Sequence, residues 1–180
     1  MKKKIFAYAL TLCLAMSLMA CGGNDDTTKA PEGDQQTESV NGTVAGDGYA
    51  FAVNGKEIQI GMTQDDLTAV LGEADSSFEA PSCAGQGTDY TLTYAGGSVE
   101  ITTVPNADGV NLVDAIVVKD DLIETPEGIA LFMSLDDVVA AYGDGYTTSG
   151  SAYIYSKGEM QLQFIVENNE VTSIQYIVAE

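Results

Sequence analysis

A segment of 13 residues occurs twice in this chain, and this internal repeat constrains the fold more than any other feature. The segment IGMTQDDLTAVLG, residues 60–72, aligns without gaps with LFMSLDDVVAAYG, residues 131–143, at a constant offset of 71 positions. The alignment pairs methionine with methionine, Thr63 with Ser134 and a double aspartate with a double aspartate, and it ends on a pair of glycines. A repeat of this kind predicts two structural units of the same type.

Each copy has the features of a short helix. Thr63 and Ser134 suit the N-cap position, and the aspartates that follow favour the positive end of the helix dipole. Gly72 and Gly143 suit the position after the last helical turn, where the backbone often takes a positive φ. Because capping explains the paired acids, they need no catalytic role. A buried stripe is expected on each helix, formed by Leu67, Val70 and Leu71 in the first and by Val138, Ala141 and Tyr142 in the second.

Segments with strand character follow each predicted helix. Three follow the first helix and three follow the second: 89–94, 98–104 and 112–118, then 151–156, 159–166 and 170–178. A short hairpin around Asn54-Gly55 precedes the first helix. We therefore predict an α+β fold of two tandem units, about 48–120 and 121–180. Each unit is a helix plus a three-stranded antiparallel meander, and the units form one layered domain with both helices on one face of the sheet.

The N-terminal residues predict export and lipid anchoring. Lysines at positions 2–4 precede an apolar run that ends in Leu18-Met19-Ala20-Cys21. This ending resembles the lipobox of bacterial lipoproteins, which implies a signal peptide at 1–20 and a diacylglyceryl group on Cys21. The resemblance places the protein at the cell membrane, anchored by lipid on the extracytoplasmic face. An ordinary signal peptide with a chance cysteine, or an uncleaved apolar helix, is the alternative.

Composition defines the next segment and excludes one class of partner. Residues 21–47 contain few large apolar side chains, so we predict that the lipidated cysteine continues into a disordered acidic stalk. The whole chain has 27 acids against seven lysines and a formal net charge of −20. Such a surface repels phosphate backbones, so nucleic acid is excluded as a partner. We interpret the charge mainly as a hydrated coat; an acidic face for a cationic partner or for Ca²⁺ is the alternative.

Several catalytic arrangements are ruled out by residue types that the sequence lacks. The chain has no histidine, which excludes the Ser-His-Asp triad, the Cys-His pair and histidine-based zinc sites. We predict no catalytic residues, no metal ligands and no cofactor. Two alternatives stay open: a carboxylate-dependent hydrolase of cell-wall glycan, and a calcium-responsive module. The segment 105–114 contains Asn106, Asp108 and Gly109, but it lacks the EF-hand pattern, and a turn is the favoured interpretation.

One insertion distinguishes the first unit from the second. It spans residues 74–88, and we predict that it is a contact loop carrying Phe78, Pro81 and Cys83. A packed loop without a partner is the alternative. Cys83 is expected to be a small buried hydrophobe, and pairing with a cysteine of another chain is its alternative.

Two resemblances complete the functional prediction. The run from Pro81 to Glu180, including DAIVVKDDLIETPEGIALFMSLDDVVAAYG, resembles uncharacterised clostridial lipoproteins. The stretch IGMT…VLGEA is similar to the opening of SmpA/OmlA lipoproteins and to the tandem repeats of the β-lactamase-inhibitor-protein fold. These are non-catalytic proteins that hold another protein with a sheet or its edge. The resemblance implies a membrane-tethered protein-binding or scaffold module of the cell envelope, whose partner is another envelope protein or a peptide.

Overall fold

The computed structural model describes residues 48–83 and 86–179. The predicted signal peptide, the lipid site at Cys21 and the predicted stalk lie outside these residues. No helix in the described part of the chain is long and apolar enough to cross a membrane.

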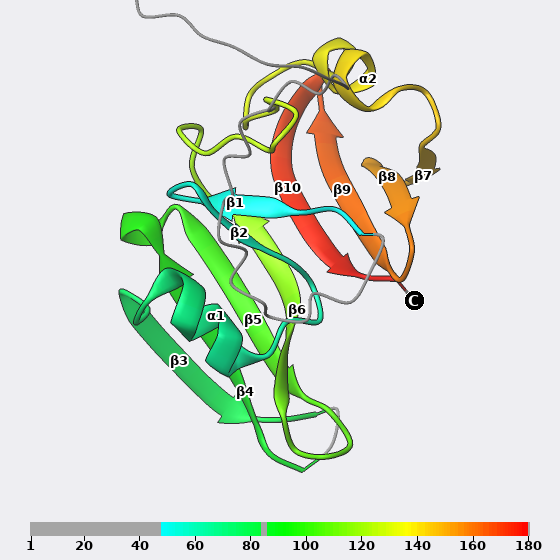
Figure 1. The fold of residues 1–180 in the computed structure, drawn as a ribbon. Helices are drawn as coiled ribbons and strands as arrows, with labels where there is room; N and C mark the ends of the chain where they lie inside the picture. The colour runs from blue at the N-terminus through cyan, green and yellow to red at the C-terminus, as the bar shows by residue number, and fades with distance from the viewer. Residues whose placement is uncertain (1–47, 84–85, 180) are drawn as a thin grey trace, which may run out of the picture. The chain divides into compact units, whose positions relative to one another are not determined.

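An antiparallel sheet of eight strands forms the centre of the fold, in the order β3-β4-β5-β6-β10-β9-β8-β7 (Figure 1). Strands β6 and β10 are hydrogen-bonded neighbours in the middle of this order. The edges are β3 on one side and β7 on the other. The strands are β3 (Ser76–Pro81), β4 (Thr88–Tyr94), β5 (Val99–Pro105), β6 (Asn111–Val118), β7 (Thr147–Ser149), β8 (Ala152–Lys157), β9 (Met160–Glu167) and β10 (Glu170–Val178).

A small hairpin and two short helices complete the described fold. Strands β1 (Phe51–Val53) and β2 (Lys56–Ile58) pair around the predicted Asn54-Gly55 turn, where both residues have positive φ. Helix α1 (Gln64–Leu71) and helix α2 (Leu135–Tyr142) each have eight residues. A 3₁₀ turn, η1 (Ala95–Gly97), joins β4 to β5.

The hydrophobic core lies on one face of the sheet. In β5 every second residue is buried, as expected for a strand with one dry face. The register aligns Ile101 with Ile116, Ile116 with Tyr176, and Tyr176 with Leu162, so one row of buried side chains crosses four strands. Leu67 of α1 and Val138 of α2 belong to the same core cluster, together with Phe51, Val53 and Ile58 of the hairpin.

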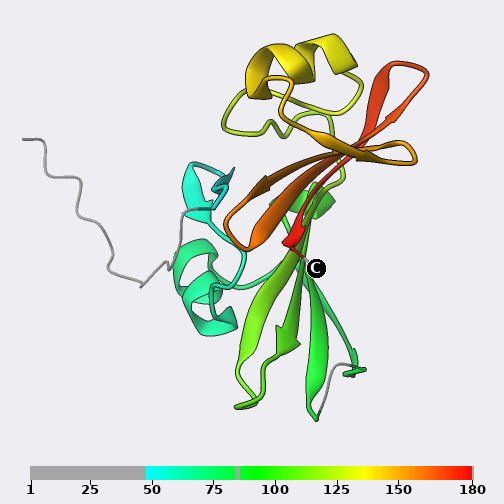
Figure 2. The same cartoon turned by 90° about the vertical axis from the view of Figure 1, so that its right-hand side faces the viewer.

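The opposite face of the sheet carries the residues that alternate with these buried residues along each strand. The register places Thr91, Thr102, Ala115, Ile177 and Gln161 in one row across it. These residues are half-buried rather than buried. No helix of the described residues covers this side of the sheet (Figure 2). We call it the open face.

The predicted helix caps are confirmed. The Thr63 hydroxyl accepts a hydrogen bond from the Asp66 amide at 3.1 Å. Ser134 and Asp137 form a complete capping box in which each side chain accepts from the other's backbone N–H.

The predicted units were wrong. Each helix is followed by four strands, not three, and all eight strands belong to one sheet in which β6 meets β10. The prediction missed β3 and β7, the two edge strands. Nearly all residues of both strands are exposed, so neither shows the alternation of apolar and polar residues by which strands are recognised.

At one position the two copies of the repeat share a backbone conformation but differ in residue type. Gly61 and Phe132 are equivalent residues, and both have a positive φ, of 83° and 68°. The Gly61 amide donates to Val113 O and the Phe132 amide to Val171 O, both at 2.8 Å, so the local backbone is the same. A left-handed backbone suits glycine and is strained in phenylalanine. The Phe132 ring is 62% exposed.

Candidate functional site

The predicted contact loop forms an edge of the sheet instead. Residues 76–81 pair with β4 along their whole length, from Ser76 with Thr93 to Pro81 with Thr88. The prediction of a loop over 74–88 was therefore wrong for its central part, and the contact role of Phe78 stays a prediction. Cys83 follows the strand and is exposed, which contradicts the expected buried thiol.

The pairing of β3 determines which of its backbone groups are free. The Ser82 amide donates to Gly87 O at 3.0 Å, just beyond the end of the strand. Bonded and non-bonded pairs alternate in an antiparallel ladder, so the backbone groups of Ser77 and Glu79 point away from β4. The backbone of Pro81 also points away from β4, but proline has no N–H group to donate. The outer side of β3 therefore presents two N–H groups and their neighbouring carbonyls.

Phe78 is the most prominent side chain of this edge. It lies in the middle of β3, opposite Thr91, and 69% of its surface is exposed. The register puts its side chain on the open face, in line with Thr102 and Ala115. Its exposure in the middle of an edge strand makes Phe78 a candidate contact residue.

Two aspartates lie further in on the sheet, Asp89 on β4 and Asp114 on β6. Asp89 of β4 is opposite Ala80, and its Oδ1 atom is buried with no hydrogen-bond partner among the described residues. Asp114 is the extra residue at the irregularity between β5 and β6. Desolvation raises the pKa of Asp114, and the nearby charge of Asp89 raises it further. Neither residue was predicted from the sequence.

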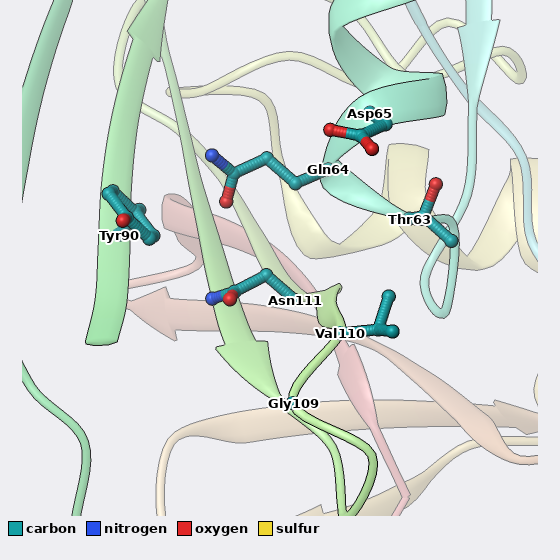
Figure 3. Close-up of a pocket in the computed structure, with 7 residues that line it drawn as sticks. All are labelled: Thr63, Gln64, Asp65, Tyr90, Gly109, Val110 and Asn111. Atoms are coloured by element: carbon teal, nitrogen blue, oxygen red, sulfur yellow. The ribbon is translucent and has the colours of Figure 1, made fainter. Parts of the chain in front are cut away.

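A polar pocket lies on the side of the sheet opposite the open face, beside the N-terminus of α1 (Figure 3). Its volume is about 320 Å³, and Gln64 and Asn111 extend into it toward Tyr90. The Gln64 Oε1 atom accepts a hydrogen bond from the Thr103 hydroxyl at 2.6 Å, and Asn111 Nδ2 donates to Thr88 O at 2.8 Å.

Asp65 is the acid in the lining of this pocket, whereas glycoside hydrolysis needs two carboxyl groups. The lining is Thr63, Gln64, Asp65, Tyr90, Gly109, Val110 and Asn111.

The segment considered for calcium forms a turn, as predicted. The Asn106 Oδ1 atom accepts hydrogen bonds from the amides of Asp108 at 3.0 Å and Val110 at 2.9 Å. That oxygen is therefore engaged by the backbone. Within 48–83 and 86–179, no group of three or more cysteines and acids is placed to hold a metal ion.

An aromatic cluster fills the core between α2 and the second half of the sheet. Its ring centroids lie 5.0 to 6.3 Å apart in tilted and edge-to-face pairs. The Tyr155 hydroxyl donates to Gly143 O at 2.8 Å, and the Tyr142 hydroxyl donates to the Glu127 carboxylate. The members are Tyr49, Phe51, Tyr142, Tyr146, Tyr153, Tyr155, Phe164 and Tyr176.

Burial in this cluster predicts loss of the fold at alkaline pH. Desolvation raises the pKa of Tyr155 from 10.0 to about 12, and it also raises the pKa values of Tyr142 and Tyr176. A raised folded-state pKa stabilises the fold fully below pH 10, and this contribution is lost as the pH rises through 12. We expect tyrosinate absorbance and far-ultraviolet circular dichroism to change together in this window. Complete ionisation of the tyrosines in a folded protein would contradict this prediction.

Comparisons with known proteins identify no family for this chain. No family model matches it, and no curated protein matches it. A solved extracellular protein containing an SCP domain from Bacillus anthracis str. Ames is similar with a TM-score of 0.39 at 14% identity. That similarity covers 67% of this chain and 44% of the other, so the chain spans less than half of that protein's length.

A second solved structure has similarity of the same order. It is the DUF4309 family protein YjgB from Bacillus subtilis subsp. subtilis str. 168, with a TM-score of 0.37 at 14% identity. The similarity covers 65% of this chain and 78% of that protein. Likeness at this level assigns neither a family nor a function to this chain.

Proposed function

We propose that this protein is a lipid-tethered, extracytoplasmic binding module of the cell envelope, which holds another protein or a peptide at edge strand β3. The anchor is the diacylglyceryl group expected on Cys21. The observation that supports binding most directly is Phe78, which is 69% exposed at the centre of edge strand β3. The counterpart edge strand in the second half, β7, is shorter and contains no aromatic residue.

The side chains around Phe78 support a contact with a protein. The exposed ring provides an apolar anchor, as aromatic residues do at the centres of interfaces. The threonines that follow it across the open face, Thr91 and Thr102, supply hydroxyl groups. The outward backbone groups of Ser77 and Glu79 supply hydrogen bonds that an extended segment could complete.

The anchor is tested by mass spectrometry of the full chain produced in cells that process lipoproteins. The expected product begins at Cys21, carries a diacylglyceryl group and sediments with membranes. A Cys21→Ser variant should lack the lipid and leave the membrane fraction. Recovery of the unmodified chain from the cytosol would contradict the tether.

Binding is tested in the same cells with a photoreactive amino acid. Benzoylphenylalanine replaces Phe78 in one variant and Phe132 in a matched variant. Both native rings are exposed, at 69% and 62%, but Phe132 is not part of the β3 edge. A protein adduct is expected at position 78 and not at position 132. Adducts at neither position, or at both equally, would contradict the proposed contact.

A further inference from the structure

The two ends of the sheet differ, although the halves of the fold repeat each other. Edge strand β7 has three residues, whereas edge strand β3 has six. Proteins usually limit exposed edges by keeping them short or by placing charged residues, lysine above all, or proline on them. β7 is short, whereas β3 is longer, contains no lysine, and has its proline only at its last position, Pro81. The insertion in the first half therefore lengthens this edge, and no strand of the described residues pairs with its outer side.

We propose that β3 binds an extended, basic segment of another protein, which adds to the sheet as a further strand with its apolar side chains on Phe78. This inference rests on the proposed binding function and specifies the partner. Strand addition of this type uses main-chain hydrogen bonds for affinity and side chains on alternate faces for specificity.

The backbone of β3 limits the length of the added segment. Ser77 and Glu79 each present an outward N–H and a carbonyl, which together satisfy a short strand of about five residues. Pro81 ends the donor series because it has no N–H. The geometry thus fits a short linear segment.

The side chains define the chemistry of that segment. On the open face, an apolar residue of the added strand would lie opposite Phe78. On the other face, Glu79 would lie opposite the neighbouring residue, where a lysine or arginine forms a favourable cross-strand pair. The nearby Asp89, whose Oδ1 atom has no hydrogen-bond partner in the described part of the chain, adds negative charge at this edge, and neither β3 nor β4 contains a lysine to neutralise it.

Charge also favours this partner over a second copy of the chain. Antiparallel self-pairing about Phe78 would place the two Phe78 rings together. It would also bring together two molecules that each carry a formal net charge of −20. Like charges of this size repel at ordinary ionic strength, whereas a basic segment is attracted.

The test measures fluorescence anisotropy of a labelled synthetic peptide of alternating valine and lysine, titrated with the full chain in detergent. A peptide of alternating valine and glutamate is the control probe. We expect the lysine peptide to bind, the glutamate peptide not to bind, and binding to weaken as salt is added. Equal binding of both peptides would overturn the basic character of the partner.

Three variants locate the binding site. Ser77→Pro removes an outward donor without breaking the β3–β4 ladder, and we expect affinity to fall about tenfold. Phe78→Ala should cause a loss of similar size by removing the apolar contact. Phe132→Ala, which truncates a similarly exposed side chain elsewhere, should bind as the native chain does. Circular dichroism establishes whether each variant is folded. If Ser77→Pro does not fold, Phe78→Ala still tests the site.

The remaining outcomes separate this inference from the proposed function. Unchanged affinity in Phe78→Ala overturns strand addition at β3. Self-association that grows with added salt and is lost in Phe78→Ala would identify a second copy as the occupant, and would overturn the basic partner. If no peptide binds but an adduct still forms at position 78 in cells, this inference fails and the binding function stands. If the adduct is also lacking, both fail.

Discussion

Replacing Leu67 by alanine should lower the free energy of unfolding by about 3 kcal/mol. Leu67 is fully buried and is the buried residue of α1. Its removal leaves a cavity that an eight-residue helix cannot easily close by shifting, because Gly61 and Met62, just before the helix, are hydrogen-bonded to Val113 of β6, both at 2.8 Å. A helix this short is not stable alone, so its packing onto the sheet maintains it.

The same variant tests whether the two halves of the fold unfold together. Leu67 and Val138 belong to one core cluster, so both Leu67→Ala and Val138→Ala should shift a single transition in urea without splitting it. Val138→Ala removes fewer atoms and should cost less, about 2 kcal/mol. Tyrosine fluorescence and far-ultraviolet circular dichroism, recorded on the same samples, provide the measurement. Separate transitions for the two probes would show that the halves are independent.

The helices and most strands were predictable because their signals are local. Thr63 and Ser134 cap the helices as expected, and each helix ends before a glycine with positive φ. The alternation in 159–166 predicted β9, where Met160, Leu162 and Phe164 are buried. Burial on one face leaves a clear period of two in such strands.

The arrangement of the units could not be predicted in the same way. The contact between β6 and β10 joins Ile116 to Tyr176, which are far apart in the sequence, and no local pattern encodes this pairing. The edge strands contribute little to the core and thus carry no buried stripe. Hydrophobic periodicity therefore indicates three strands in each unit where the fold has four.

The candidate site, too, could be predicted only in part. Phe78 was selected because an insertion distinguishes the first copy of the repeat, and that comparison needs only the sequence. Its strand conformation was missed because Ser76 to Pro81 is exposed and contains a proline. Asp89 was missed although a signal existed: in 89–94, polar residues alternate with Tyr90, Leu92 and Tyr94, which assigns Asp89 to the face opposite the core.

Replacing Gly143 by alanine should destabilise the fold by about 2 kcal/mol, through the backbone alone. Gly143 has φ 82° and ψ −174°, a region that essentially only glycine occupies. A Cβ atom built at this position meets nothing within 4 Å, so no steric clash contributes. The residue must keep this conformation because its N–H bonds to Val139 O and its carbonyl accepts from the Tyr155 hydroxyl, both at 2.8 Å.

A neighbouring glycine provides the matched control for this variant. Gly145 also has nothing within 4 Å of a built Cβ, but its φ is not in the positive range. Gly145→Ala should leave the free energy of unfolding unchanged or raise it by up to about 1 kcal/mol, because alanine lowers the entropy of the unfolded chain. Urea unfolding of both variants gives the comparison. Equal stability of Gly143→Ala and Gly145→Ala would show that the chain after α2 relaxes freely, and that the bonds made by Gly143 do not hold its backbone in place.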